Sequence, residues 1–127
     1  MQRINPDTVA KPASNYSHGI VHRSGGDRLV ISGQVGLRPD GTMADGVEAQ
    51  AEQAWQNILN IVAAAGFARE DLIRVTTYVT VPGQVAVCRE VRDRALEGHS
   101  CANTYLEIAG LAAPGWLVEI EAEAVKE

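Results

Sequence analysis

The sequence has 127 residues, of which 46% are hydrophobic and 21% are charged, and its formal net charge is −5. These values are typical of one globular domain with its own core, and they exclude disorder as the main state. The acidic balance disfavours nucleic acid or an anionic membrane surface as a partner, because both attract clustered Lys and Arg. Two cysteines, Cys88 and Cys101, are too few for a disulfide scaffold.

The start of the chain predicts a polar arm. Residues 1–15 are polar and contain Pro6 and Pro12. They lack the basic start and the apolar run of a secretory signal, and no later stretch approaches the roughly 18 apolar residues of a membrane span. We therefore expect a soluble cytoplasmic protein with a single domain over residues 1–127.

A hairpin is predicted next, from strands over 19–23 and 28–32 joined by a glycine-containing turn. Glycines then mark a long irregular loop, and apolar residues at helical spacing predict a helix over 47–65. Asp45 and Glu48 resemble a capping box at the start of this helix, and Gly66 suits a left-handed cap at its end.

The second half of the chain predicts one more helix and three strands. β-branched residues indicate a strand over 72–81, and Pro82 is suited to start a helix that closes at Gly98. Two strands follow over 103–111 and 117–125. This order of elements predicts an α+β fold, with one mixed sheet and both helices on one of its faces.

The last strand alternates apolar residues with Glu119, Glu121 and Glu123. If both helices cover one face of the sheet, its other face is bare, and a partner subunit is the simplest cover. The alternation places the three carboxylates together on one face, where a carboxyl group can serve as a general acid or base. The alternative is a solvated strand face without chemistry.

The histidines and cysteines offer weaker signals. His18 and His22 fall in a predicted strand, where residues four apart lie about 13 Å from each other, so we expect no metal site. His99 and Cys101 are close in sequence and could form a nucleophilic Cys–His pair, with ordinary loop residues as the alternative. Cys88 lies on an apolar helix face, which indicates core packing.

Several segments, in their order and spacing, resemble the RidA/YjgF/UK114 family of the Rid superfamily. They are Tyr16-Ser17-His18-Gly19, Leu29-Val30-Ile31-Ser32-Gly33-Gln34, the helix segment 50–57, Ala65-Gly66, Asp71, Val75-Thr76-Thr77-Tyr78-Val79 and Leu117-Val118-Glu119-Ile120-Glu121-Ala122. The resemblance implies a chorismate-mutase-like fold and a homotrimer whose three sheets form a central barrel. It also implies clefts between subunits, where reactive imines and enamines such as 2-aminoacrylate are hydrolysed to 2-keto acids and ammonia without a cofactor or metal.

The resemblance extends to individual site residues. Glu119 matches the family's glutamate, which orients or activates the attacking water. Tyr16, Ser32 and Gly33 match residues that line the family's cleft.

One position departs from the family pattern. The family's arginine, which clamps the substrate carboxylate, falls on Asn103, and the family's Arg-Ser-Cys is replaced here by Asn103-Thr104-Tyr105. An asparagine carries no charge, and losing a charge-assisted pair typically costs several kcal/mol of binding. We therefore expect a divergent member that does not use the usual small 2-imino acids, and whose cleft is reshaped by Tyr105.

Arg89 falls where typical members have an asparagine in the cleft, and this arginine could replace the missing anchor. The alternative is a surface arginine paired with Glu90, Asp93 or Glu97. Three functions follow as hypotheses: a hydrolase (deaminase) with Glu119 as the catalytic residue, a trimer that binds a small metabolite without turnover, and, disfavoured by the acidic charge, a protein that acts on RNA.

Overall fold

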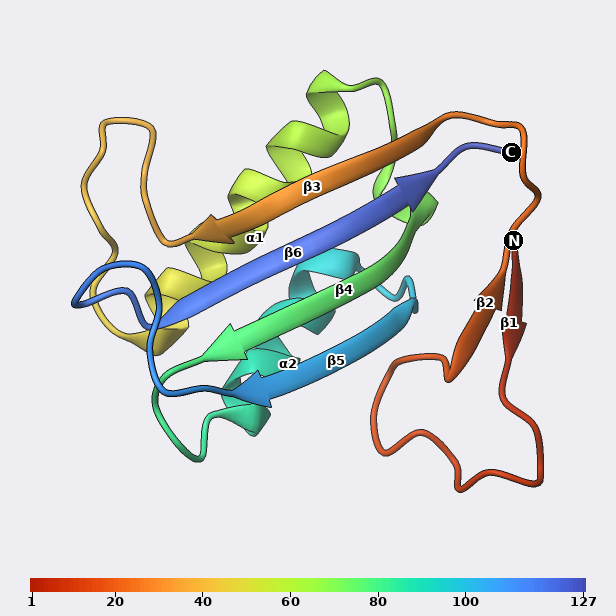
Figure 1. The fold of residues 1–127 in the computed structure, drawn as a ribbon, viewed down its shortest axis with the longest axis horizontal. Coiled ribbons are helices and arrows are strands. Elements are labelled where there is room, and N and C mark those ends of the chain that lie inside the picture. Colours follow the sequence, from red (N-terminus) through yellow and green to blue (C-terminus); the bar gives the residue numbers. More distant parts are fainter.

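The computed structural model describes residues 1–127 as a four-stranded mixed sheet covered on one face by two helices, with a small two-stranded sheet beside it (Figure 1). This confirms the predicted α+β class. Its strands are β1 (Gln2–Ile4), β2 (Gly19–Val21), β3 (Arg28–Val35), β4 (Leu72–Val79), β5 (Ala102–Glu107) and β6 (Val118–Val125), and its helices are α1 (Val47–Ala64), the short 3₁₀ helix η1 (Arg69–Asp71) and α2 (Val85–Leu96).

The large sheet has the strand order β3–β6–β4–β5. β6 is antiparallel to both of its neighbours, whereas β4 and β5 are parallel. Both helices lie behind this sheet in Figure 1. The buried core forms between the two layers, where Trp55 and Ile58 of α1 and Val91 of α2 join Val75 and Ile120 of the sheet in one apolar cluster.

The helix and strand signals with clear periodicity are confirmed. The helix predicted over 47–65 is α1, and Gly66 follows it at φ +78°, in the left-handed conformation that favours glycine. The capping box is wrong, because the N-cap residue is Gly46 and no side chain bonds to the first amides. Pro82 lies in the turn before α2, and the left-handed residue that ends α2 is Glu97, one residue before Gly98.

The predicted hairpin over 19–32 is also wrong. β2 pairs with β1 of the arm, and β3 pairs with β6. The physical reason is burial: Leu29 and Ile31 of β3 lie opposite Ala124 and Ala122 of β6, on the face that the helices cover. β3 also continues past a bulge to Val35, so the irregular loop starts later than predicted.

The face of the sheet away from the helices is called the open face below. It carries the three carboxylates of β6, and across from them lie Arg74, Thr76 and Tyr78 of β4. The alternation predicted for β6 is therefore confirmed. Val30 is 65% exposed and Leu106 is 43% exposed, and their register places both on this face.

The N-terminal arm is tied to the start of β5. The Ser17 amide donates to the Cys101 carbonyl over 3.0 Å, and Arg3 Nε donates to the Ser100 carbonyl over 2.9 Å. A second Arg3 nitrogen contacts His99 Nδ1 at 3.0 Å, while His99 Nε2 donates to the Leu72 carbonyl over 2.7 Å. No helix of the structure combines the length and apolar character needed to cross a membrane.

Candidate functional site

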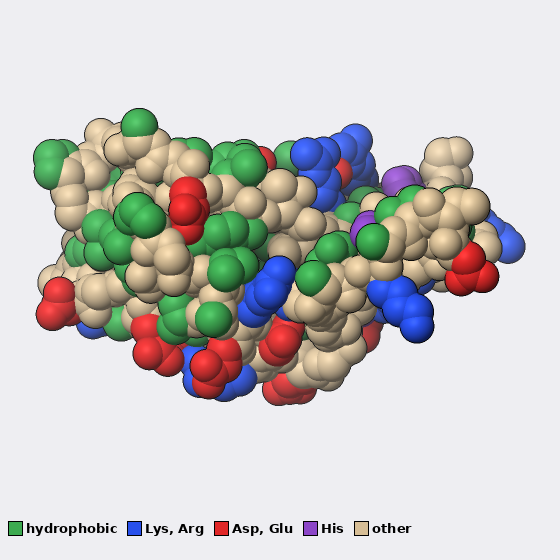
Figure 2. All heavy atoms as spheres, turned by 90° about the horizontal axis from the view of Figure 1, so that it is seen from below, with side chains coloured by type: hydrophobic (Ala, Val, Ile, Leu, Met, Phe, Trp, Pro, Cys, Tyr) green, Lys and Arg blue, Asp and Glu red, His purple; other side chains and the backbone are tan.

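A cavity of about 260 Å³ lies between the N-terminal arm, β5 and α2. It is called the arginine cavity below. Figure 2 views the molecule from the side on which β5 and the arm lie in Figure 1, and basic side chains reach the surface near the boundary between the arm and the body of the protein. The cavity is lined by Ser14, Tyr16, Thr77, Val85, Cys88, Arg89, Arg92, Asn103 and Tyr105.

Local structure explains why these side chains meet. Asn103 and Tyr105 alternate along β5 and lie beside Val75 and Thr77 of β4, on the face that the helices cover. Helical spacing brings Cys88, Arg89 and Arg92 to one side of α2. The arm, tied down at Ser17, adds Ser14 and Tyr16. Four of the residues predicted for the site, Tyr16, Arg89, Asn103 and Tyr105, thus line one cavity.

The lining of the arginine cavity contains two arginines and no carboxylate, in a protein whose net charge is −5. Arg92 is only 3% exposed; its Nε lies 3.0 Å from an Asp93 carboxylate oxygen, and its Nη2 lies 3.4 Å from Ser14 Oγ. Arg89 forms no ion pair. The alternative of a paired surface arginine is therefore wrong, because Glu90, Asp93 and Glu97 pair instead with Arg94, Arg92 and Arg69.

Asn103 has an orphaned polar atom. Its Oδ1 is buried and has no hydrogen-bond partner in the chain, and it is the only buried side-chain nitrogen or oxygen in this state. Such an atom carries the desolvation penalty of a lost hydrogen bond, of the order of 1–3 kcal/mol.

The neutral groups of the arginine cavity stay protonated near neutral pH. Burial raises the pKa of Tyr105 to about 12, and its hydroxyl donates to a Glu107 carboxylate oxygen over 3.1 Å. Burial also raises the pKa of Cys88 to about 11. Cys88 is therefore a poor nucleophile, because the thiolate is the reactive form.

The other predicted site residues, Ser32, Gly33 and Glu119, lie away from the arginine cavity. A Cβ built on Gly33 would lie 2.6 Å from Cδ of Glu119, so only glycine leaves room for this carboxylate. Glu119 lies opposite Tyr78, on the open face, whereas the cavity lies on the helix side of the sheet. A single chain therefore does not bring Glu119 to Asn103.

Glu119 differs from the two other carboxylates of its strand. Tyr78 donates its hydroxyl to Glu121 over 2.7 Å, and this bond raises the pKa of Tyr78. Glu123 pairs with Arg28 at 2.9 Å. Glu119 has neither kind of partner, so it is the carboxylate of the open face that is free to contact a ligand or a second chain.

The hypothesis of a Cys–His pair is wrong. Both ring nitrogens of His99 are engaged, by Arg3 and by the Leu72 carbonyl. Burial raises the pKa of Cys101 to about 11. No group of three or more His, Cys, Asp or Glu side chains is arranged to hold a metal ion.

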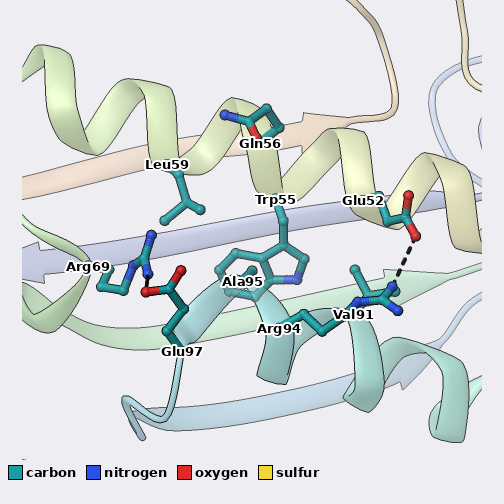
Figure 3. A pocket seen from close by; sticks show the side chains of 9 residues that line it. All are labelled: Glu52, Trp55, Gln56, Leu59, Arg69, Val91, Arg94, Ala95 and Glu97. Atoms are coloured by element: carbon teal, nitrogen blue, oxygen red, sulfur yellow. Dashed lines mark hydrogen bonds and ion pairs between the residues drawn. The ribbon is translucent and has the colours of Figure 1, made fainter.

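A second cavity, of about 300 Å³, lies between α1 and α2 (Figure 3). Trp55, Leu59 and Ala95 supply apolar walls, and the charged side chains neutralise each other. Arg94 pairs with Glu52 at 2.9 Å, and Arg69 pairs with Glu97. No predicted site residue lines this groove, and its paired charges leave no group for a ligand to neutralise.

Arg92 is the main residue that the sequence interpretation missed. Between Asp93 and Glu90, an arginine is typical of a solvated helix face. The only available signal was its spacing of three residues from Arg89, which places both on one side of a helix. Its burial depends on the arm, which no local pattern predicts.

The fold and the cavity beside β5 define an α+β protein of the Rid type. The chain belongs to the RidA/YjgF/UK114 family, and the family described as Endoribonuclease L-PSP matches residues 7–126.

Individual proteins support this assignment. A RutC family protein of Pyrococcus horikoshii is 32% identical over 126 residues, which cover 98% of this chain and 97% of that protein. A 2-iminobutanoate/2-iminopropanoate deaminase of Salmonella typhimurium is 31% identical over 104 residues, which cover 79% of each chain. Among solved structures, the Rid-family protein YyfB of Yersinia pestis superposes with a TM-score of 0.88 at 31% identity, covering 98% of both chains.

Proposed function

We propose that the protein is an imine or enamine hydrolase that works as a homotrimer, with its sites between subunits. The observation that carries this proposal is the arginine cavity, because Tyr16, Arg89, Asn103 and Tyr105 converge on it from the arm, α2 and β5. The family's deaminases supply the class of reaction. The charge of the protein argues against RNA as its substrate.

The proposed site needs two copies of the chain. Glu119 with Ser32 and Gly33 lies on the open face, and the cavity lies on the helix side. Packing of one copy's open face beside the β5 edge of the next would bring Glu119 of one subunit to the cavity of another. The bare open face, with Val30 at 65% exposure, supports such contact.

The proposed chemistry uses Glu119 as a general base. Its carboxylate takes a proton from water as the water oxygen bonds to the imine carbon, and the C=N π pair moves to nitrogen, which takes a proton from solvent. The resulting carbinolamine then gives up its hydroxyl proton to solvent as C=O forms, and the C–N bond breaks as ammonia leaves with the proton that Glu119 returns. An enamine first takes a proton on carbon to become the imine.

The substrate is proposed to differ from the usual small 2-imino acids. Asn103 cannot form the bidentate pair that an arginine forms with a carboxylate, and Tyr105 fills part of the space that a cysteine would leave. Ammonia release from imines made in situ by an amino-acid oxidase tests this. We expect acceleration for a bulkier imine over 2-iminopropanoate, and no acceleration with any imine contradicts the hydrolase.

A subunit-mixing experiment tests the shared site. Glu119→Gln and Arg89→Gln each damage one half of the proposed cleft, so both homotrimers should be slow. After unfolding and refolding of the two variants together, some clefts combine two intact halves, and activity should return to about a quarter of the wild-type value if subunits mix at random. Without recovery in verified mixed trimers, the shared cleft is wrong.

A trimer that binds a metabolite without turnover is the second candidate, and the uncharged Asn103 favours it. This candidate predicts a ligand that co-purifies with the trimer and is released without chemical change. The imine panel separates the two candidates, since only the hydrolase releases ammonia.

A further inference from the structure

The N-terminal arm is attached to the start of β5 through polar contacts, one of which involves a buried histidine. Its strands β1 and β2 form a ribbon of their own, which lies beyond the start of β5 and is not hydrogen-bonded into the large sheet (Figure 1). Arg3 and Ser17 of the arm reach the carbonyls of Ser100 and Cys101. Arg3 also contacts the ring of His99, which is buried.

Both ring nitrogens of His99 have a fixed role, because each partner can play only one part in a hydrogen bond. The Leu72 carbonyl oxygen, 2.7 Å from Nε2, only accepts, so Nε2 must carry a proton. The Arg3 guanidinium, 3.0 Å from Nδ1, only donates, so Nδ1 must be unprotonated. The ring is therefore neutral while Arg3 is bound to it.

A second proton on His99 would break this arrangement. An imidazolium has an N–H donor at both nitrogens, so Nδ1 would direct a donor at the donors of Arg3, and two positive charges would be in contact. The surroundings are already positive on the side of β5. Burial raises the pKa of the neighbouring Cys101, whereas Arg92 and Arg3 act in the opposite direction, so both guanidinium groups lie close enough to act there.

No negative charge is placed to balance an imidazolium at His99. None of the ion pairs of the protein includes this ring. Glu97, at the end of α2, pairs instead with Arg69 of η1. Asp71, the last residue of η1, accepts a hydrogen bond from the Ala68 amide. The contact between His99 and the arm therefore depends on the neutral ring.

The other two histidines do not share this sensitivity. His18 Nε2 lies 2.6 Å from the Ala10 carbonyl oxygen, and His22 Nδ1 lies 3.1 Å from the Arg23 carbonyl oxygen. A carbonyl accepts a hydrogen bond from an imidazolium as well as from a neutral ring, so protonation preserves both contacts. His99 is thus the histidine whose contact requires an unprotonated nitrogen.

We propose that His99 and Arg3 form a proton-sensitive latch, which holds the N-terminal arm at neutral pH and releases it in acid. Histidine changes its charge between about pH 5 and 8, which is the range such a latch needs. The released arm allows a proton on His99 that the latched arm excludes, so acidification favours release. Ser14 and Tyr16 leave the arginine cavity with the arm, and the cavity loses one wall. The latch does not depend on the proposed function.

Hydrogen–deuterium exchange of the intact protein at about pH 7.5 and 5.5 tests the latch, with each rate divided by the intrinsic exchange rate at that pH. The Ser17 amide, which donates to the Cys101 carbonyl over 3.0 Å, reports on the arm. Its protection should fall about 10-fold at the lower pH, because one linked proton shifts an equilibrium by up to about tenfold per pH unit. The amide of Ile58, inside α1, should change by less than about twofold.

Variants assign the pH response to the latch. Arg3 is exposed, so Arg3→Met should fold even if the buried His99 tolerates no substitution. Its Ser17 amide should be poorly protected at both pH values and differ by less than about twofold between them. His99→Gln, which is neutral at every pH, should also lose the pH response. His22→Gln is the matched control and should keep the roughly 10-fold fall.

The latch is wrong if the arm of the unmodified protein is equally protected at both pH values, or if Arg3→Met keeps the 10-fold fall. A fall that His22→Gln abolishes would assign the response to His22 and would also contradict the latch. These measurements need neither a ligand nor ammonia release, so failure of the hydrolase and failure of the latch are told apart.

Discussion

The arginine cavity and the open face are two sides of one sheet with opposite chemistry. The cavity lining holds two arginines without a carboxylate, whereas β6 places three carboxylates on the open face. The cavity offers an anchor for an anion and lacks a base. The open face offers an unpartnered base, Glu119, and lacks an enclosed space around it.

The arginines of the cavity and the carboxylate of Glu119 lie on opposite faces of the sheet, so a single chain holds two halves of the proposed site without joining them. A carboxylate placed inside the cavity would pair with Arg89 or Arg92 and neutralise the anchor. Separation by the sheet leaves both halves unneutralised until two copies meet. The proposed site therefore depends on assembly, and the following changes test that separation.

The largest effect is expected from Glu119→Gln. Loss of a general base typically slows a reaction by a factor of about 10²–10⁴, and the amide has nearly the same size as the carboxylate. Ammonia release should fall by at least about 100-fold with unchanged circular dichroism. Glu123→Gln is the matched control on the same strand and face, and because Glu123 pairs with Arg28 it should stay within about twofold. Equal losses of ammonia release in the two variants would show that Glu119 has no special role.

Alkali should destabilise the protein through the buried thiol of Cys101. Cys101 is buried at 1% exposure, and its carbonyl accepts a hydrogen bond from Ser17 of the arm. Burial raises the pKa of its thiol from 9.0 to about 11. The folded protein therefore holds a proton that the unfolded chain loses above pH 9, so stability is full below pH 9 and falls as the pH rises towards 11. The loss is about 3 kcal/mol.

Urea unfolding at pH 8, 10 and 11 measures this slope. Cys101→Ala should start from a lower stability and lose less of it on the way to pH 11. The same slope in the variant and in the parent protein would assign the alkaline loss to other groups, such as Cys88 and Tyr105, whose pKa values are also raised.

Gly33→Ala should disturb the open face and leave the cavity intact. The new methyl group would lie 2.6 Å from Cδ of Glu119, so the carboxylate must turn away. Ammonia release should fall about 10-fold, because misplacement of a catalytic group by 1 Å can cost 10²-fold. Gly110→Ala is the control, since no atom lies within 4 Å of its added Cβ.

The sequence predicted the elements with strong periodicity and failed on pairing. α1, β4 and β6 each bury a regular pattern, which is a local property of the sequence. β1 has three residues and pairs with β2, so it has no periodicity to detect. The partner of β3 depends on which apolar faces meet in the core, and that is a property of the whole chain.

Only those site residues that could be matched one by one to residues of the family were predicted from the sequence. Resemblance identified Tyr16, Asn103, Tyr105 and Arg89 as candidates, and the structure places all of them around one cavity. Arg92 was not predicted because its surroundings include Ser14 of the distant arm, which lies 3.4 Å from its Nη2. The orphaned Oδ1 of Asn103 is likewise a product of packing, since the sequence shows an asparagine and not its surroundings.

The smallest effect is expected at the arm, whose attachment shapes the cavity from outside. Arg3→Ala removes the donors to the Ser100 carbonyl and to His99 Nδ1, which should cost about 1 kcal/mol of stability. Because Ser14 and Tyr16 belong to the same arm and line the arginine cavity, ammonia release should fall by about two- to threefold, and proteolysis within the arm should accelerate. Arg23→Ala, which removes an arginine without a side-chain hydrogen bond, should change neither. If Arg3→Ala speeds proteolysis without slowing ammonia release, the attachment of the arm does not shape the cavity, and Tyr16 has no part in turnover.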